Sequence, residues 1–241
     1  MRGLEYLFAA QLPNGGWPQV WPLEGGYHDA ITFNDGAVTE TIELLQEVAD
    51  GKEGFAFVPE RLRARARGSV AKGIECILAT QIVQTGHRTV WAQQHDGLNL
   101  QPVAGRNYEP AAQCGSESAA LVLFLMRLPQ PSPAVVDTVH AAVAWFRKTA
   151  VYGKAYGRGA DGRRLTSVDG AGPIWARFSE IGTDRAVFGD RDQSIHDDGN
   201  ELSAERRNGY SWYNAGPREA LDRYAEWSAS HPPRVPAGPV L

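Results

Sequence analysis

The sequence predicts a mainly α-helical fold, an (α/α) toroid or barrel of helical hairpins with a few short β pieces and long aromatic loops. Apolar residues recur with helical spacing over most of the chain. A weak internal repeat, offset by roughly 70 residues, also places a helix that ends in Gln before a Trp-x-Gln turn, at Trp17 and again at Trp91. Helix pairs that each send a loop to the same end of the molecule are typical of such arrays.

We expect six helices, over residues 3–11, 35–50, 59–81, 116–128, 132–146 and 217–230. Asp35 is suited to be an N-cap, and the Asp50-Gly51 pair is suited to end that helix. Pro59 belongs in a first turn, and Ser132-Pro133 reads as a cap followed by an N1 proline. The helix over 116–128 is apolar nearly all round, which predicts a central position.

Strand signals are short, at residues 88–91, 172–178 and 210–213. We expect a single domain over residues 1–230. The proline-rich tail 231–241 is predicted to lie extended over the surface.

Composition indicates an ordinary globular chain of 241 residues with 43% hydrophobic and 22% charged residues and a net charge of −4. The densest basic run, residues 61–72, is interpreted as a solvated helix face, so no nucleic-acid partner is expected. No apolar run reaches transmembrane length, and no membrane partner is expected. Cys76 and Cys114 are too few for a disulfide framework and are predicted to be buried free thiols.

One long segment, residues 11–37, is too rich in Gly, Pro, Trp and Tyr to be a helix, although helix patterns lie on both sides. Ordered loops of this length are usually functional. The segment predicts a groove for a polar, flat-faced ligand, for which a sugar ring is a natural candidate.

Seven segments occur in one order along residues 4–227: QLPNGGWPQVWPL, ITFNDGA, WAQQHD, GRNYEP before Ser116-Glu117-Ser118, WARF, FGDRDQSI and RRNGYSWY. Together they resemble the family 10 pectate lyases. The resemblance implies an (α/α) toroid that cleaves α-1,4-polygalacturonate by calcium-assisted β-elimination. It also implies a secreted or periplasmic protein, although no signal peptide is visible in this chain. We expect a monomer.

Such chemistry explains the residue types. A base removes the C5 proton beside the uronate carboxylate, and the C4–O bond then breaks. The carboxylate's negative charge must be offset for this proton to leave, which calls for hard oxygen ligands for Ca²⁺, arginines for substrate carboxylates, and one base.

The resemblance implies that Asp35 binds calcium, with Asn34 as a further oxygen donor. From the residues alone, Asp35 would be only the N-cap of its helix. Arg106, in GRNYEP, matches the family's proposed base. A guanidinium is an unusual base because its pKa exceeds about 12, so the role requires a locally lowered pKa or alkaline pH. The other interpretation is an arginine in a surface loop.

Arg177 in WARF and Arg191 in FGDRDQ match arginines that grip substrate carboxylates, a task that suits bidentate guanidinium geometry. Their structural alternative is pairing with Asp184, Asp190 or Asp192. Trp17, and with it Trp21 and Tyr27, is predicted to stack on sugar faces, or else to anchor its loop. Asp96, with Gln93, Gln94 and His95, is predicted to line the groove.

The family usually carries another helix pair upstream, with an Asp-Asn pair that completes the calcium site. We therefore expect a truncated chain with an incomplete calcium site. Two further hypotheses follow. One is a non-catalytic pectate-binding remnant that keeps the arginines. The other is a glycoside hydrolase with Asp96 and Glu117 as its paired carboxylates.

Overall fold

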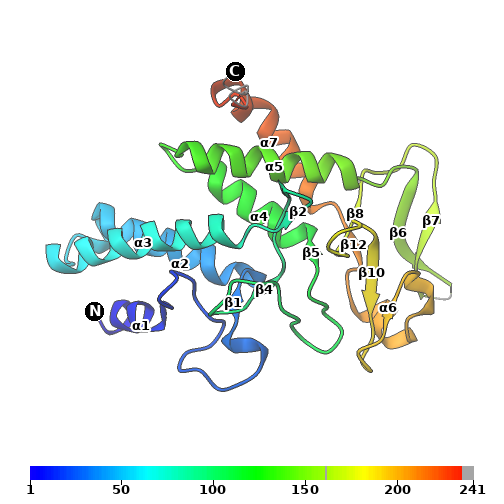
Figure 1. Cartoon of the computed structure of the whole chain (residues 1–241), viewed down its shortest axis with the longest axis horizontal. Coiled ribbons are helices and arrows are strands. Elements are labelled where there is room, and N and C mark those ends of the chain that lie inside the picture. The colour runs from blue at the N-terminus through cyan, green and yellow to red at the C-terminus, as the bar shows by residue number, and fades with distance from the viewer. Residues whose placement is uncertain (161, 235–241) are drawn as a thin grey trace.

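The computed structural model describes residues 1–160 and 162–234. Most helices lie over one part of the molecule and the longer strands at the other, while several short strands lie beside the helices (Figure 1). The α-helices are α1 (Arg2–Ala10), α2 (Ala37–Asp50), α3 (Glu60–Thr80), α4 (Gly115–Met126), α5 (Pro133–Thr149), α6 (Ala204–Gly209) and α7 (Gly216–Ser230). All six predicted helices are confirmed, to within three residues at each end. Only the short α6 was not predicted.

The capping signals explain this agreement, with one exception. Ser132 accepts a hydrogen bond from the Val135 amide at the start of α5, and Gly51, at φ 64°, ends α2. The capping role predicted for Asp35 is wrong. The N-cap of α2 is Gly36, and Asp35 itself adopts a left-handed conformation (φ 52°) within η2, the short 3₁₀ turn Asn34–Gly36.

Short antiparallel strands join the loops. They are β1 (Ile31–Thr32), β2 (Val83–Gln84), β3 (His87–Arg88), β4 (Gln94–His95), β5 (Gln113–Cys114), β6 (Lys154–Gly159), β7 (Gly162–Ser167), β8 (Trp175–Ala176), β9 (Phe178–Ser179), β10 (Ala186–Gly189), β11 (Ile195–His196) and β12 (Tyr213–Asn214). Four of them form a sheet in the order β11-β10-β9-β5.

The strand predictions were only partly right. The predicted strand 88–91 is confined to its first residue, at the end of β3, and 210–213 to its last, at the start of β12. The segment 172–178 contains β8 and reaches β9. The hairpin of β6 and β7, whose strands have six residues each, was not predicted.

The internal repeat is confirmed and has a third copy. In each copy a buried tryptophan donates its indole N–H to the carbonyl four residues before the C-cap of the preceding helix, which is Gln11, Gln81 or Ala150. The bonds are Trp17 to Leu7 (2.9 Å), Trp91 to Ile77 (2.7 Å) and Trp175 to Phe146 (2.7 Å). These bonds fix where each loop leaves its helix.

Each copy also closes its loop in the same way. The residue after the tryptophan pairs antiparallel with a residue just ahead of the next long helix: Pro18 with Ile31, Ala92 with Gln113, and Ala176 with Tyr213. The three units therefore share one order of helix, turn, strand and helix. The closure of these units into a toroid is not tested by these contacts and stays a prediction.

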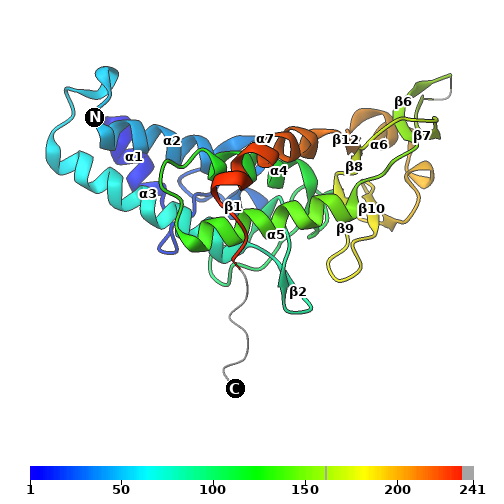
Figure 2. The same cartoon turned by 90° about the horizontal axis from the view of Figure 1, so that it is seen from above.

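Packing follows the repeat. Seen from above, α3 and α5 follow one another along one side, with α2, α4 and α7 along the other (Figure 2). Their facing sides form one large apolar core, and a smaller core rich in aromatic residues lies among the strands. Cys76 and Cys114 are buried and free, as predicted. Among the described residues, no helix combines the length and apolarity needed to cross a membrane. Most of the predicted extended tail, residues 235–241, lies outside the described residues.

Candidate functional site

Arg106 lies in a tight turn between β4 and β5. The Glu109 amide donates to the Arg106 carbonyl (2.8 Å), and the Gly105 amide donates to the Glu109 carbonyl (3.0 Å). Gly105 lies close to both side chains: a Cβ at this position would lie 2.6 Å from Gln94 Oε1 and 2.7 Å from Glu109 Oε2, so a larger residue would displace one of them. The turn therefore brings Arg106 against the strand that carries Gln94.

A buried carboxylate holds this arginine. Glu109 is 2% exposed and accepts from Arg106 Nη2 (2.5 Å), from the Arg106 amide (2.9 Å) and from the Tyr210 hydroxyl (2.6 Å). Burial acts to raise the pKa of Glu109, but the hydrogen bonds from Arg106 and Tyr210 outweigh it, so the pKa is lowered. Hydrogen bonding to Glu109 raises the pKa of Arg106 above its ordinary value. Arg106 is thus a firmly protonated cation in this state.

Arg177 is held in a similar way by Glu117, in the first turn of α4. Their side chains are 15% and 7% exposed, with Nη2 and Oε1 2.7 Å apart. The Cys114 thiol donates to the other oxygen of Glu117, and burial raises the pKa of this thiol, which keeps it a neutral donor. Desolvation acts to lower the pKa of Arg177, but the charge of Glu117 outweighs it and the pKa is raised.

Arg191 lies in the loop after β10. It donates from Nε and Nη2 to the two oxygens of Glu205 on α6 (3.2 and 3.1 Å), and Glu205 also accepts from Arg206. Asn107, next to Arg106, donates to the Arg191 carbonyl. Gly189 is required at the end of β10, because a Cβ there would lie 2.3 Å from the Tyr108 carbonyl.

Two tyrosine rings join these groups. Tyr108 and Tyr210 lie edge to face with centroids 5.2 Å apart. The Cζ atoms of Arg106, Arg191 and Arg206 lie 5.1, 5.1 and 4.2 Å from the Tyr108 centroid, and those of Arg106 and Arg177 lie 5.8 and 4.8 Å from the Tyr210 centroid. We call these four arginines and two tyrosines the arginine–tyrosine cluster. Its four guanidinium groups face three carboxylates, Glu109, Glu117 and Glu205.

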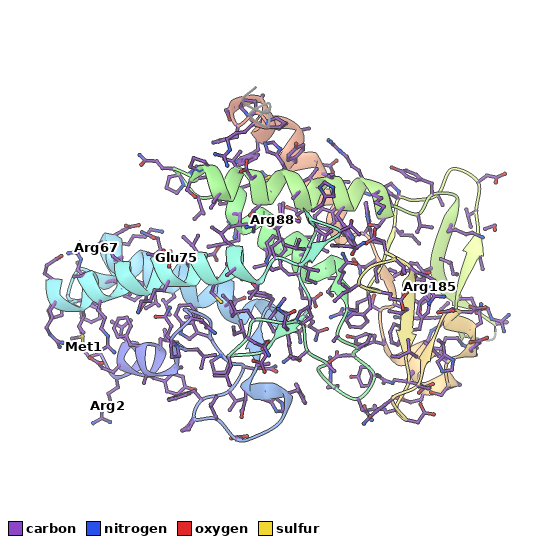
Figure 3. The ribbon with its side chains drawn as sticks, in the orientation of Figure 1. Met1, Arg2, Arg67, Glu75, Arg88 and Arg185 are labelled. Atoms are coloured by element: carbon purple, nitrogen blue, oxygen red, sulfur yellow. The ribbon has the colours of Figure 1, made fainter. Side chains whose placement is uncertain are left out.

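The structure therefore brings the three predicted arginines together. The alternative of side-chain pairing with Asp184, Asp190 or Asp192 is wrong for both Arg177 and Arg191, because their carboxylate partners are Glu117 and Glu205. Some arginines elsewhere form other ion pairs. Arg67, on α3, and Arg185, among the strands, lie far apart from each other in Figure 3, and each has its own carboxylate partners.

Asp35 lies in η2, which packs beside α4. Just before this turn, the Phe33 amide donates to the Gln93 carbonyl (3.0 Å). Asp35 and Glu117 occupy one position of the repeat, four residues after Ile31 and Gln113 respectively. Both carboxylates thus belong to the loop end of the molecule.

The Asp35 carboxylate is exposed and accepts from the Asn34 amide nitrogen (3.1 Å). Within residues 1–160 and 162–234, no group of three or more His, Cys, Asp or Glu side chains could hold a metal ion. Asp35 and the Asn34 amide oxygen are hard donors that suit calcium, but calcium takes 6–8 oxygen ligands. The donor type fits the ion, and further ligands would have to come from outside these two residues.

Trp17 and His95 have structural roles, and Asp96 also holds its own loop. Trp17 is 2% exposed, so no ring face is open to a sugar, and the loop-anchor alternative describes it in place of the predicted stacking. Asp96 accepts from the Leu98 and Asn99 amides (2.8 and 2.9 Å), which lower its pKa and hold its loop. His95 bonds the Leu100 carbonyl and the Ala92 amide, and burial lowers its pKa to about 4.

A groove of about 640 Å³ nevertheless runs beside Asp96, as the loop composition predicted. It lies between the loop 23–30 and the loop 96–105, and Tyr27, Asp96 and Gly105 are among its lining residues. It therefore ends directly beside the Arg106 turn.

Sequence reasoning missed Glu109, Tyr108, Tyr210, Arg206 and Glu205. One local signal was present: Arg106 and Glu109 are three residues apart in a turn-rich segment. The repeat also sets apart Arg177, which was predicted, because its Trp-x-Arg turn corresponds to the Trp-x-Gln turns of Gln19 and Gln93.

The comparisons with known proteins decide the family. The model of the pectic acid lyase family matches residues 1–221. The chain belongs to this family. A solved structure of a family 10 polysaccharide lyase from Cellvibrio cellulosa is similar over 94% of this chain and 71% of its own, with a TM-score of 0.88 and 33% identity. A mutant of that lyase in complex with trigalacturonic acid is also similar, at 33% identity and a TM-score of 0.87 over 93% of this chain and 71% of its own. No curated protein matches the chain.

Family membership and geometry together count against the glycoside hydrolase hypothesis. Glu117 is committed to Arg177 and the Cys114 thiol, and Asp96 to backbone amides. Glu117 is therefore not free to act as an acid or a base on a glycosidic bond, and the lowered pKa of Asp96 makes it a poor proton donor.

Proposed function

We propose that this protein is a pectate lyase that cleaves α-1,4-polygalacturonate by β-elimination and leaves 4,5-unsaturated oligogalacturonides. The observation that carries the proposal is the convergence of Arg106, Arg177 and Arg191 on Tyr108 and Tyr210. Family membership and the trigalacturonate complex of the Cellvibrio lyase support a polygalacturonate substrate. The same family resemblance leads us to propose secretion or export to the periplasm.

The chemistry assigns a task to each group. A base takes the C5 proton, the electron pair of that C–H bond forms the C4–C5 double bond, and the C4–O bond breaks. The leaving oxygen takes up a proton. Negative charge builds on the uronate carboxylate, so Arg177 and Arg191 stabilise the transition state by binding substrate carboxylates. Both arginines are already held by carboxylates, which fixes their guanidinium planes.

Arg106 is our proposed base. It is the most accessible guanidinium of the cluster apart from Arg191, with 40% of its side chain exposed, and the preceding residue, Gly105, lines the groove. Its contact with Glu109 favours the protonated form, so the neutral form is a small fraction that grows tenfold for each pH unit. This predicts a lyase whose turnover rises toward alkaline pH.

Calcium completes the proposal. Asp35 and Asn34 would hold the ion, and the remaining ligands would be substrate carboxylate oxygens and water. When bound, Ca²⁺ would neutralise carboxylate charge near the reacting carbon.

A lyase assay tests the function. Polygalacturonate and calcium are added to the protein, and the ultraviolet absorbance of the unsaturated product is followed. We expect product from the native chain, and none above background from Arg106→Ala. Normal turnover in excess chelator would contradict the calcium assignment.

Calorimetry with trigalacturonate separates this proposal from the binding-remnant hypothesis. A remnant would bind the trisaccharide in a salt-dependent manner and release no unsaturated product. Arg106→Ala should still bind, because Arg177 and Arg191 remain.

A further inference from the structure

The Glu109 carboxylate bonds both the guanidinium and the backbone amide of Arg106. One carboxylate oxygen accepts from the guanidinium and the other from the backbone amide, at 2.5 and 2.9 Å. The same two residues are joined through the main chain by the Glu109 amide and the Arg106 carbonyl. Such a double contact fixes the side-chain direction of Arg106 as well as the shape of its turn.

The exposure of the two partners is very unequal. The Glu109 side chain is 2% exposed, whereas that of Arg106 is 40% exposed. The carboxylate lies behind the guanidinium, against Tyr210 and the strand of Gln94. Glu109 therefore has no open side for a substrate, while Arg106 presents one.

We propose that Glu109 is the positioning residue of this site, and that it sets the pH at which Arg106 can accept the substrate proton. This inference rests on the proposed lyase function and on Arg106 as its base. Glu109 acts through Arg106 and makes no contact with the sugar. The contact with Glu109 fixes the direction of the Arg106 side chain, but it also favours the protonated form of Arg106, which cannot accept a proton.

The charged groups around Arg106 and Glu109 determine the direction in which the pKa of Arg106 is moved. Tyr108 and Tyr210 flank Arg106, Arg177 lies over the Tyr210 ring, and Arg191, Arg206 and Glu205 lie around the Tyr108 ring. Among these, Glu109 is the carboxylate bonded to Arg106. An opposite charge this close typically moves a pKa by about 1–3 units toward the charged form. Without it, Arg106 would lose its proton at a lower pH.

The test is the pH profile of kcat for Glu109→Gln, which keeps the shape and removes the charge. We expect the alkaline rise of kcat to move about 1–3 pH units lower, with a lower maximum because the arginine is less well aimed. A fall in kcat at every pH without this shift would overturn the proposal.

A second variant moves the profile the other way. Tyr210→Phe removes one hydrogen-bond donor from Glu109, so the negative charge of Glu109 acts more strongly on Arg106. We expect the rise of kcat to shift toward higher pH, so this variant keeps the proposal falsifiable if Glu109→Gln does not fold. A shift toward lower pH in Tyr210→Phe would contradict the inference.

Two controls separate the causes. Glu180→Gln removes one of the two carboxylate partners of Arg185, in an exposed ion pair outside the cluster, and should leave the pH profile in place. Arg106→Ala tests the proposed function itself. If Arg106→Ala still turns over substrate, Arg106 is not the base. If it is inactive while Glu109→Gln keeps the native profile, only the role proposed for Glu109 is wrong.

Discussion

The three buried tryptophans of the repeat and the two tyrosines of the arginine–tyrosine cluster use their rings in opposite ways. Trp17, Trp91 and Trp175 are buried, and each indole N–H bonds a helix carbonyl. In the cluster, the Tyr108 and Tyr210 rings carry guanidinium groups against them, and the Tyr210 hydroxyl bonds a carboxylate. The same class of side chain fixes the backbone in one region and places charge in the other. Single arginines also lie over rings among the helices, Arg65 over Phe8 and Arg147 over Tyr224, so what distinguishes the cluster is the gathering of four guanidinium groups on two rings.

The largest effect that would test this contrast is on stability. Trp91 is fully buried, so Trp91→Ala should lower the free energy of unfolding by about 3–5 kcal/mol, measured by urea denaturation. Tyr152→Ala, at a ring 68% exposed, is the control and should change little. A loss below about 1 kcal/mol for Trp91→Ala would break the contrast, because a core anchor must cost more than one hydrogen bond.

Glu117→Gln tests the cluster side. Arg177 would keep a hydrogen-bond acceptor but lose its charged partner, so we expect a loss of about 3 kcal/mol and a raised KM for polygalacturonate. Glu43→Gln breaks an exposed pair with Arg127 and should cost less than about 1 kcal/mol. An unchanged KM for Glu117→Gln would mean that Arg177 does not bind substrate.

Asp184 sharpens the contrast, because it is a buried carboxylate outside the cluster. Burial acts to raise its pKa, but hydrogen bonds from Lys148, Trp145 and Gln84 lower it. A lowered folded-state pKa stabilises the protein above the unfolded value of 3.8 and ceases to do so as pH falls through the folded value.

Asp184→Asn should therefore cost about 2 kcal/mol at pH 7, and this difference from the native protein should shrink below about pH 4. Asparagine tolerates the left-handed backbone at this position (φ 60°). Urea denaturation across pH 3–7 measures the difference. A cost that stays constant over this range would show that the Asp184 charge is not what stabilises the fold.

The smallest effect concerns Trp17. Trp17→Phe removes the bond to the Leu7 carbonyl and should cost about 1 kcal/mol, with KM unchanged. A several-fold rise in KM without loss of stability would restore the sugar-stacking role.

The sequence predicted the helices well because their ends carry local signals, such as Ser132-Pro133 and Asp50-Gly51. It failed at Asp35, where Gly36 takes the capping position and leaves the aspartate exposed. The β6–β7 hairpin was missed because its strands carry no clear alternation of apolar residues. For the site, motif resemblance found Arg106, Arg177 and Arg191. Glu109 and Tyr210 were missed because their contact joins residues 101 positions apart, which no local pattern records.

The closing pairs of the three repeat units have a consequence for how this scaffold can diversify. Between the paired residues the chain makes excursions of different length, 13 residues from Pro18 to Ile31, 21 from Ala92 to Gln113, and 37 from Ala176 to Tyr213. Entry and exit are fixed while the intervening length is free. New recognition segments can therefore be inserted between the two residues of a closing pair, as loops are inserted into an antibody framework, without redesign of the helices underneath.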